Sequence, residues 1–216
     1  MSRPPILRAI QGGLEATYRV STDLDVEDFL VDDRQRRAAH AGRTPEEQLL
    51  VHEADGEVAI GLFVDGGALE RLTHHDPRRR LDEDNLPDFL LALEGVSHFV
   101  YLAHRARASR SVSAVELELQ AEVDKWLVAT LVSWAQAGAP WADLRVRLFG
   151  RVHYLPDLSA EERDRYRLAN GTANEYAARL EARFLRRGAV AEMLAELRRF
   201  YHQGLTGKLD LIRRVA

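Results

Sequence analysis

The chain has no cysteine, and this absence removes several kinds of chemistry at once. Disulfide bonds, zinc sites built on thiolates, iron–sulfur clusters and cysteine nucleophiles all require a thiol. The 216 residues must therefore be stabilised mainly by burying apolar surface, and 46% of them are hydrophobic. This length and composition are typical of one large globular domain or of two small ones.

Lysine is almost as scarce. Only Lys125 and Lys208 are lysines among the 30 basic residues, so the other 28 are arginines. Such an excess has two interpretations: guanidinium groups that bind phosphates or carboxylates with paired hydrogen bonds, or a coding bias that supplies arginine, alanine and leucine everywhere. The coding bias is favoured, because isoleucine is also rare beside the many leucines and alanines.

Long apolar runs and an export signal are missing too. The segment after Pro5 is too polar for the core of a signal peptide and lacks a small-residue cleavage site. The least charged stretch, residues 126–141, is too short and too often interrupted by glutamine, glycine and proline to cross a bilayer. These features predict a cytoplasmic protein that does not engage a membrane.

Charge is divided unevenly along the chain, with a net charge of −9 over residues 1–95 and +5 over residues 96–216. No linker rich in proline, glycine and serine lies near residue 95, so we interpret the division as two layers of complementary charge. We predict a core domain over residues 1–158 and a helical subdomain over residues 159–216 that packs on it, together forming one compact unit.

Three segments are predicted to form strands. Two β-prone runs flank Asp55-Gly56, a dipeptide typical of type I′ turns, and predict a hairpin over residues 48–65. A nearly continuous apolar run predicts a buried strand near residues 97–105, and alternating apolar and basic residues predict another over residues 143–154. The expected fold is α+β, with an antiparallel sheet of about four strands covered by helices.

Capping signals predict where several helices begin. Ser113 and Glu116 form the pattern of a capping box and open a helix to about Ala137. The same pattern occurs at Ser159 and at Thr172, each followed three residues later by glutamate. A shorter helix is expected from Leu86, with Gly95 as its end.

No motif that carries chemistry is complete. His98 and His104 share one face of the predicted strand but would lie roughly 20 Å apart, too far to bind one ion. His52-Glu53 lacks the second histidine of a metalloprotease pattern, and no glycine-rich phosphate loop is present. We therefore expect no catalytic residue, metal ligand or cofactor that can be named from the sequence.

Basic residues form the clearest remaining pattern. Arg145, Arg147, Arg151 and His153 would lie on one face of the predicted strand, with Arg105 in a nearby arginine-rich loop. This arrangement suits phosphates or a row of carboxylates on a partner, so these five residues are candidates for binding an anion or a partner. Exposed arginines or salt bridges to the acidic first part of the chain also explain the pattern, and this interpretation is favoured because surface ion pairs are common.

Acidic residues at the start of the predicted long helix suggest a second arrangement. Glu116, Glu118 and Glu122 alternate with other residues, as do Gln120 and Asp124. In a helix these five side chains would be distributed around its whole circumference. Some of them must therefore contact other parts of the protein, and the nearby arginines are natural partners. This predicted charged network is either structural or the floor of an anion site.

Three hypotheses about function follow. The leading one is a cytoplasmic accessory or interaction protein without catalytic activity, which binds a protein partner or associates with itself. The second is binding of nucleic acid or another anionic ligand through the arginine face, although the net charge of −4 disfavours nucleic acid. The third is a metal-assisted hydrolase whose histidines and carboxylates are brought together only by the fold.

Overall fold

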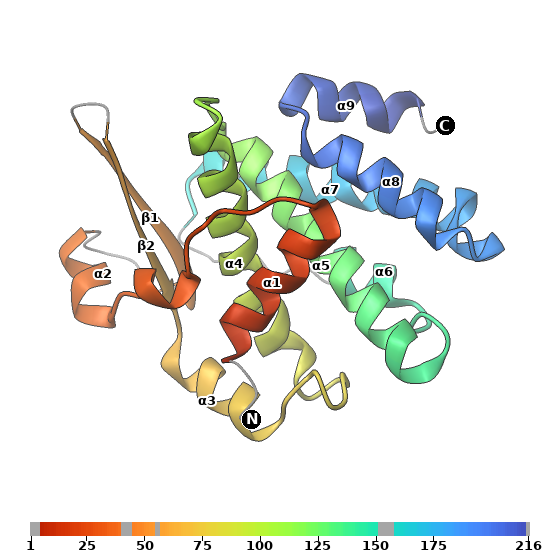
Figure 1. The fold of residues 1–216 in the computed structure, drawn as a ribbon, viewed down its shortest axis with the longest axis horizontal. Helices are drawn as coiled ribbons and strands as arrows, with labels where there is room; N and C mark the ends of the chain where they lie inside the picture. Colours follow the sequence, from red (N-terminus) through yellow and green to blue (C-terminus); the bar gives the residue numbers. More distant parts are fainter. Residues whose placement is uncertain (1–4, 40–44, 55–56, 151–157, 215–216) are drawn as a thin grey trace.

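The computed structural model describes residues 5–39, 45–54, 57–150 and 158–214 (Figure 1). Within these residues the protein is mostly helical and contains one small antiparallel sheet. In chain order the elements are α1 (Ile6–Tyr18), the short 3-10 helix η1 (Val26–Phe29), α2 (Asp33–Ala39), β1 (Glu47–Ala54), β2 (Glu57–Val64), α3 (Gly66–His74), α4 (Leu86–Arg107), α5 (Ala114–Ala137), α6 (Leu144–Phe149), α7 (Ala160–Arg183), the 3-10 helix η2 (Leu185–Arg187), α8 (Val190–Tyr201) and α9 (Leu205–Arg214).

The predicted hairpin is confirmed. Strands β1 and β2 pair antiparallel, with Glu47 opposite Val64 and Ala54 opposite Glu57. The other edge of β2 is partly covered, because the Val31 N–H donates a hydrogen bond of 2.9 Å to the carbonyl of Leu62. One end of the hairpin packs on α4, and from there the two strands extend away from that helix (Figure 1).

The prediction of a four-stranded sheet is wrong. Residues 97–105 lie inside α4, and residues 144–149 form the short helix α6; residues 151–154 lie outside the described residues. Helix α4 is buried on several sides, so it is apolar nearly all round and shows no single stripe. A short apolar run of this kind looks the same in a buried helix and in a buried strand.

The predicted helix starts are partly correct. The side chain of Ser113 accepts a hydrogen bond of 3.2 Å from the Glu116 backbone N–H, and Ser159 forms a complete capping box with Glu162. The pattern at Thr172 does not begin a helix, because it lies in the middle of α7. Likewise α4 continues through Gly95. A local capping or stop pattern does not by itself end a helix, because tertiary packing of an amphipathic or buried face supplies most of the helix's stability.

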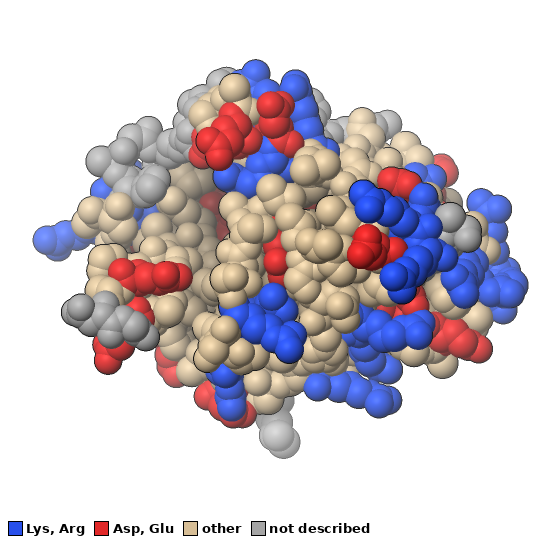
Figure 2. All heavy atoms as spheres, turned by 90° about the horizontal axis from the view of Figure 1, so that it is seen from above, with Lys and Arg blue, Asp and Glu red and all other residues tan. Residues whose placement is uncertain are grey.

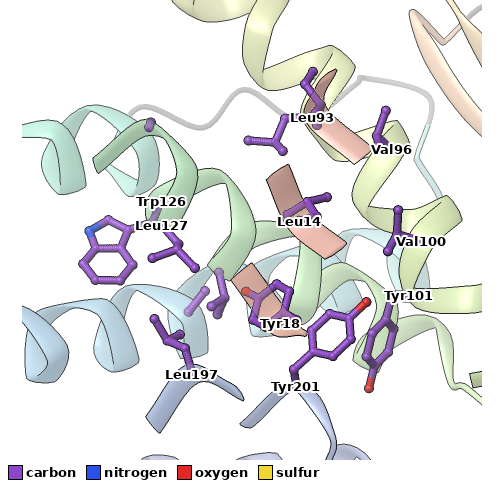
Figure 3. Packing of buried hydrophobic residues seen from close by; sticks show 14 of the residues in the cluster. Leu14, Tyr18, Leu93, Val96, Val100, Tyr101, Trp126, Leu127, Leu197 and Tyr201 are labelled. Atoms are coloured by element: carbon purple, nitrogen blue, oxygen red, sulfur yellow. The ribbon is translucent and has the colours of Figure 1, made fainter. Parts of the chain in front are cut away.

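Helices α4 and α5 form the centre of the protein, and α1 and α8 close the core around them. Figure 3 shows side chains from these four helices pointing into one apolar cluster. Helix α7 packs along α5, and α8 contacts α1, so the C-terminal helices lie against the rest of the chain. The division into a core domain and a helical subdomain stays a prediction.

Helix α4 has the length and apolar composition that a membrane-crossing helix needs. However, 67% of its most apolar window is buried inside the protein. A core helix passes the same test of length and composition, and the burial of α4 is what its central position in the fold requires.

A buried polar network joins α1, α4, α5 and α9. The carboxylate of Asp124 accepts hydrogen bonds from the Tyr18 hydroxyl, from the Ser97 hydroxyl at 2.5 Å and from the Gln120 amide at 2.8 Å. The ammonium of Lys208 donates to the Gln120 side-chain carbonyl and lies 4.1 Å from the centre of the Phe200 ring. Burial lowers the pKa of Lys208 to about 7.

Replacing Lys208 with methionine is expected to remove a pH dependence of stability. The pKa of this lysine is about 7 in the folded protein and 10.5 by its ordinary value, so the unfolded chain binds more protons between these limits. The free energy of unfolding of the wild type therefore rises with pH across that window, by at most about 1.4 kcal/mol per pH unit. Urea unfolding over this range measures it, and equal slopes in both proteins would contradict the expectation.

Replacing a helical glycine with alanine should change the free energy of unfolding in opposite directions at two positions, Gly95 and Gly12. A Cβ at Gly95 would lie 2.9 Å from Leu62 Cδ1 and 3.0 Å from Glu47 Cγ, whereas a Cβ at Gly12 meets nothing within 4 Å. We expect Gly95→Ala to destabilise the protein by about 1–3 kcal/mol through overpacking. Gly12→Ala should stabilise it by roughly 0.5–1 kcal/mol. Unfolding free energies that change in the same direction would count against this account of the contact between the hairpin and α4.

Candidate metal centre

Three elements bring an imidazole and several carboxylates together. Glu94 and His98 are four residues apart on α4 and so lie on the same face of that helix. Helix α5 packs along this face and contributes Glu118, and the start of β1 contributes Glu47. One ligand atom from each of Glu94, His98 and Glu118 lies within 4.8 Å of the other two.

The two ring nitrogens of His98 face different carboxylates. Nε2 lies 3.6 Å from Glu118 Oε2, and Nδ1 lies 3.5 Å from Glu47 Oε1. Two atoms that bind one ion at about 2.1 Å each lie roughly 3.0–3.5 Å apart. The separation of His98 and Glu118 is therefore close to that of two ligands on one ion and longer than an ordinary hydrogen bond.

Buried polar atoms without hydrogen bonds mark the same place. Among the described residues, His98 Nε2 and Glu47 Oε1 are both buried and have no hydrogen-bond partner. The His98 side chain is only 6% exposed, so water does not readily compensate for the missing bond. The nearest carboxylate oxygen to Nε2 is that of Glu118 at 3.6 Å, which is beyond hydrogen-bond distance. A buried nitrogen without a hydrogen bond costs about 1–3 kcal/mol, and a bound ion would remove this cost.

Glu47 has the position of a group that orients a metal-binding histidine. When one ring nitrogen of a histidine binds a metal, the other usually donates its hydrogen to a carboxylate, a carbonyl or water. Here Nε2 faces Glu118 and Nδ1 faces Glu47. Glu118 is thus placed to bind the ion together with Nε2, and Glu47 is placed to orient the ring through Nδ1. The residues that could hold a metal are therefore Glu94, His98 and Glu118, with Glu47 behind the imidazole.

Charge at the cluster favours a cation. Burial opposes the charged form of His98, but the carboxylates of Glu118 and Glu47 outweigh it and hold the His98 pKa well above its usual value. Burial also raises the pKa of Glu47. On α7, burial and the carboxylates of Glu118 and Glu94 together raise the pKa of Tyr166 to about 12.

A lysine lies beside the imidazole in the same cluster. Lys125 Nζ donates to Glu94 Oε2 at 2.9 Å and to Glu122 Oε1 at 2.7 Å. Glu94 therefore contacts the ammonium on one side and faces His98 on the other. Its side chain is 25% exposed against 6% for His98, so Glu94 is the more exposed of these two residues.

The predicted arginine face is not present as a strand. Arg145 and Arg147 lie on the helix α6, where residues two apart point in nearly opposite directions. Arg145 binds Glu181 at 3.0 Å and Arg147 binds Glu83 at 2.8 Å. Arg151 and His153 lie outside the described residues.

Exposed arginines are found at another end of the molecule. Figure 2 shows basic side chains gathered at the end where α8 begins in Figure 1, and the exposed Arg183, Arg186 and Arg187 lie in this part of the chain. Binding of an anionic ligand stays a prediction.

The three glutamates of the predicted network divide between two places. Glu116 accepts a hydrogen bond of 2.6 Å from the Tyr101 hydroxyl and lies 3.6 Å from Arg105, which is buried. Glu118 and Glu122 belong instead to the cluster around His98 and Lys125. Of the three, only Glu116 pairs with an arginine in the described contacts.

Sequence reasoning missed Glu47, Glu94, His98 and Lys125 as a group. Glu94 and His98 have the spacing of two neighbours on a helix, and this was the signal that could have found them. The helix expected to end at Gly95 and the strand expected near residues 97–105 hid it, because they placed the two side chains on different elements. Glu47 comes from a distant strand and has no local signal.

Comparison of the chain with protein-family models, with curated proteins and with solved structures finds no match.

Proposed function

We propose that this protein binds one divalent transition-metal ion through Glu94, His98 and Glu118 and acts as a metal-assisted hydrolase. One observation carries the proposal. Among the described residues, His98 Nε2 is buried and makes no hydrogen bond, and it lies 3.6 Å from Glu118 Oε2, close to the separation of two atoms that bind one ion. A core histidine that served packing alone would be expected to have a hydrogen-bond partner.

The ligand types narrow the choice of ion. An imidazole with two carboxylates suits Mn²⁺, Fe²⁺ or Zn²⁺, whereas Ca²⁺ and Mg²⁺ favour oxygen ligands alone. Structural zinc sites are closed by four protein ligands, and catalytic sites keep three and leave a position for water. Three ligands are available here, which favours a catalytic centre.

Hydrolysis is the reaction class that this ligand set supports best. A bound divalent ion supplies a nucleophile at neutral pH by lowering the pKa of a coordinated water molecule. Lys125 donates a hydrogen bond that holds Glu94 in place, and Glu47 lies 3.5 Å from His98 Nδ1, where it would orient the ring once the other nitrogen binds the ion. Solvent exposure of Glu94 gives the side from which a substrate would approach.

Metal binding is the first expected outcome. Metal-free protein dialysed against Mn²⁺, Fe²⁺ or Zn²⁺ should retain about one ion per chain by elemental analysis. Glu118→Gln should weaken binding more than tenfold, and Glu47→Gln by about 10–100-fold, as for other groups that orient a ligand. Glu192→Gln, at an exposed position on α8, is the control and should leave binding unchanged. Wild-type protein that retains no ion would overturn the proposal.

Activity is the second expected outcome. The metal-loaded protein should hydrolyse at least one of a phosphate ester, a carboxylic ester and an amide, and this activity should disappear on chelation and in His98→Gln. Full metal occupancy without turnover on a broad panel would contradict the hydrolase and leave a metal-binding protein.

A second candidate function is interaction with a protein partner. Val51 and Val58 are 45% and 42% exposed and lie on the same face of the hairpin as Leu62, which is buried against the helices. The apolar face of the sheet thus continues beyond the part of the protein that covers it. A hairpin of two strands is only marginally stable by itself, so a partner on this face would stabilise it.

A further inference from the structure

The ammonium of Lys125 occupies a position built from carboxylates. Its side chain is 14% exposed and its nitrogen lies within 2.9 Å of one oxygen from Glu94 and one from Glu122. Two hydrogen bonds to two different helices fix it more closely than an exposed salt bridge would. Although burial opposes the charged form, the two carboxylates hold the pKa of Lys125 well above its ordinary value.

Glu94 links this position to the metal centre. One of its oxygens accepts from Lys125, and the residue also belongs to the group of possible ligands with His98 and Glu118. The helices repeat the arrangement, because Glu94 and His98 are four apart on α4 and Glu118 and Glu122 are four apart on α5. Two neighbouring cation positions therefore share one carboxylate.

A carboxylate that lies between two cation positions in this way is typical of two-metal sites. In such sites two ions lie about 3.5–4 Å apart and act together on the attacking and leaving oxygens of the substrate. An ammonium donates hydrogen bonds to the same carboxylate oxygens that a metal ion would bind, but at longer distances, since N–H···O contacts are about 2.7–2.9 Å long and metal–oxygen bonds are about 2.0–2.2 Å.

We propose that the cluster is a two-cation centre in which the ammonium of Lys125 fills the second position. Lys125 is thus the residue that makes the protein hold one divalent ion instead of a pair bridged by Glu94. This inference rests on the proposed metal site, and it restricts the reaction to chemistry that one ion and one fixed positive charge support.

Removing the charge of Lys125 tests the proposal directly. Lys125→Met keeps a similar length and opens the second position, whereas Lys125→Arg keeps a positive charge there. After dialysis of the metal-free proteins against Mn²⁺, the wild type and Lys125→Arg should each hold about one ion per chain. Lys125→Met should approach two, with the electron paramagnetic resonance spectrum of a magnetically coupled pair.

A double variant provides the matched control. Lys125→Met combined with Glu122→Gln lacks a carboxylate of the second position and should return to one ion per chain. Folded Lys125→Met protein that binds one ion or none would overturn the inference, even if the wild type binds one ion and the proposed function stands. Wild type that binds no ion would overturn both.

The single variant Glu122→Gln keeps the inference testable if Lys125→Met does not fold. Glu122 binds Lys125 and is not among the ligands of the metal position, so Glu122→Gln should still hold one ion with an affinity within about tenfold of the wild type. Loss of binding as large as that in Glu118→Gln would show that Glu122 ligates the ion, and this would overturn the division into two positions.

Discussion

Polar contacts between α4 and α5 run along the interface of these two helices and connect the candidate centre with the buried network. Four pairs form this polar seam, namely Glu94–Lys125, Ser97–Asp124, His98–Glu118 and Tyr101–Glu116. Numbers rise along α4 as they fall along α5, so the helices are antiparallel. A small slide of one helix would separate the partners of each of these pairs.

Charged and polar groups at such an interface cost free energy when they are taken out of water, and their mutual contacts offset that cost only when the geometry is good. Each group left without its partner would add about 1–3 kcal/mol. The polar seam therefore fixes the relative position of α4 and α5 more than it stabilises them. One consequence is that Glu94, His98 and Glu118 are held on rigid helices without the help of a loop, which is the arrangement that a binding site requires.

The sequence supports correct predictions wherever a local rule decides the structure. The hairpin follows from Asp55-Gly56 and two β-prone runs, and the starts of α5 and α7 follow from Ser113 and Ser159. Tertiary contacts decide the rest. Helix α4 is apolar on most sides because it is surrounded, and that removes the period by which a helix is detected. The candidate centre was lost with it, since Glu94 and His98 become neighbours only when the segment is helical.

Charge balance explains why one ion suits this cluster. Four carboxylates, those of Glu47, Glu94, Glu118 and Glu122, face one lysine and one histidine in a mostly buried space. Even with the histidine protonated, an excess of negative charge remains, and charge in a medium of low dielectric constant is costly. A divalent ion that replaces the histidine proton reduces this excess. A second divalent ion beside Lys125 would instead place two divalent ions and the ammonium, five positive charges in all, around the shared carboxylate of Glu94, so the lysine and a second ion exclude each other.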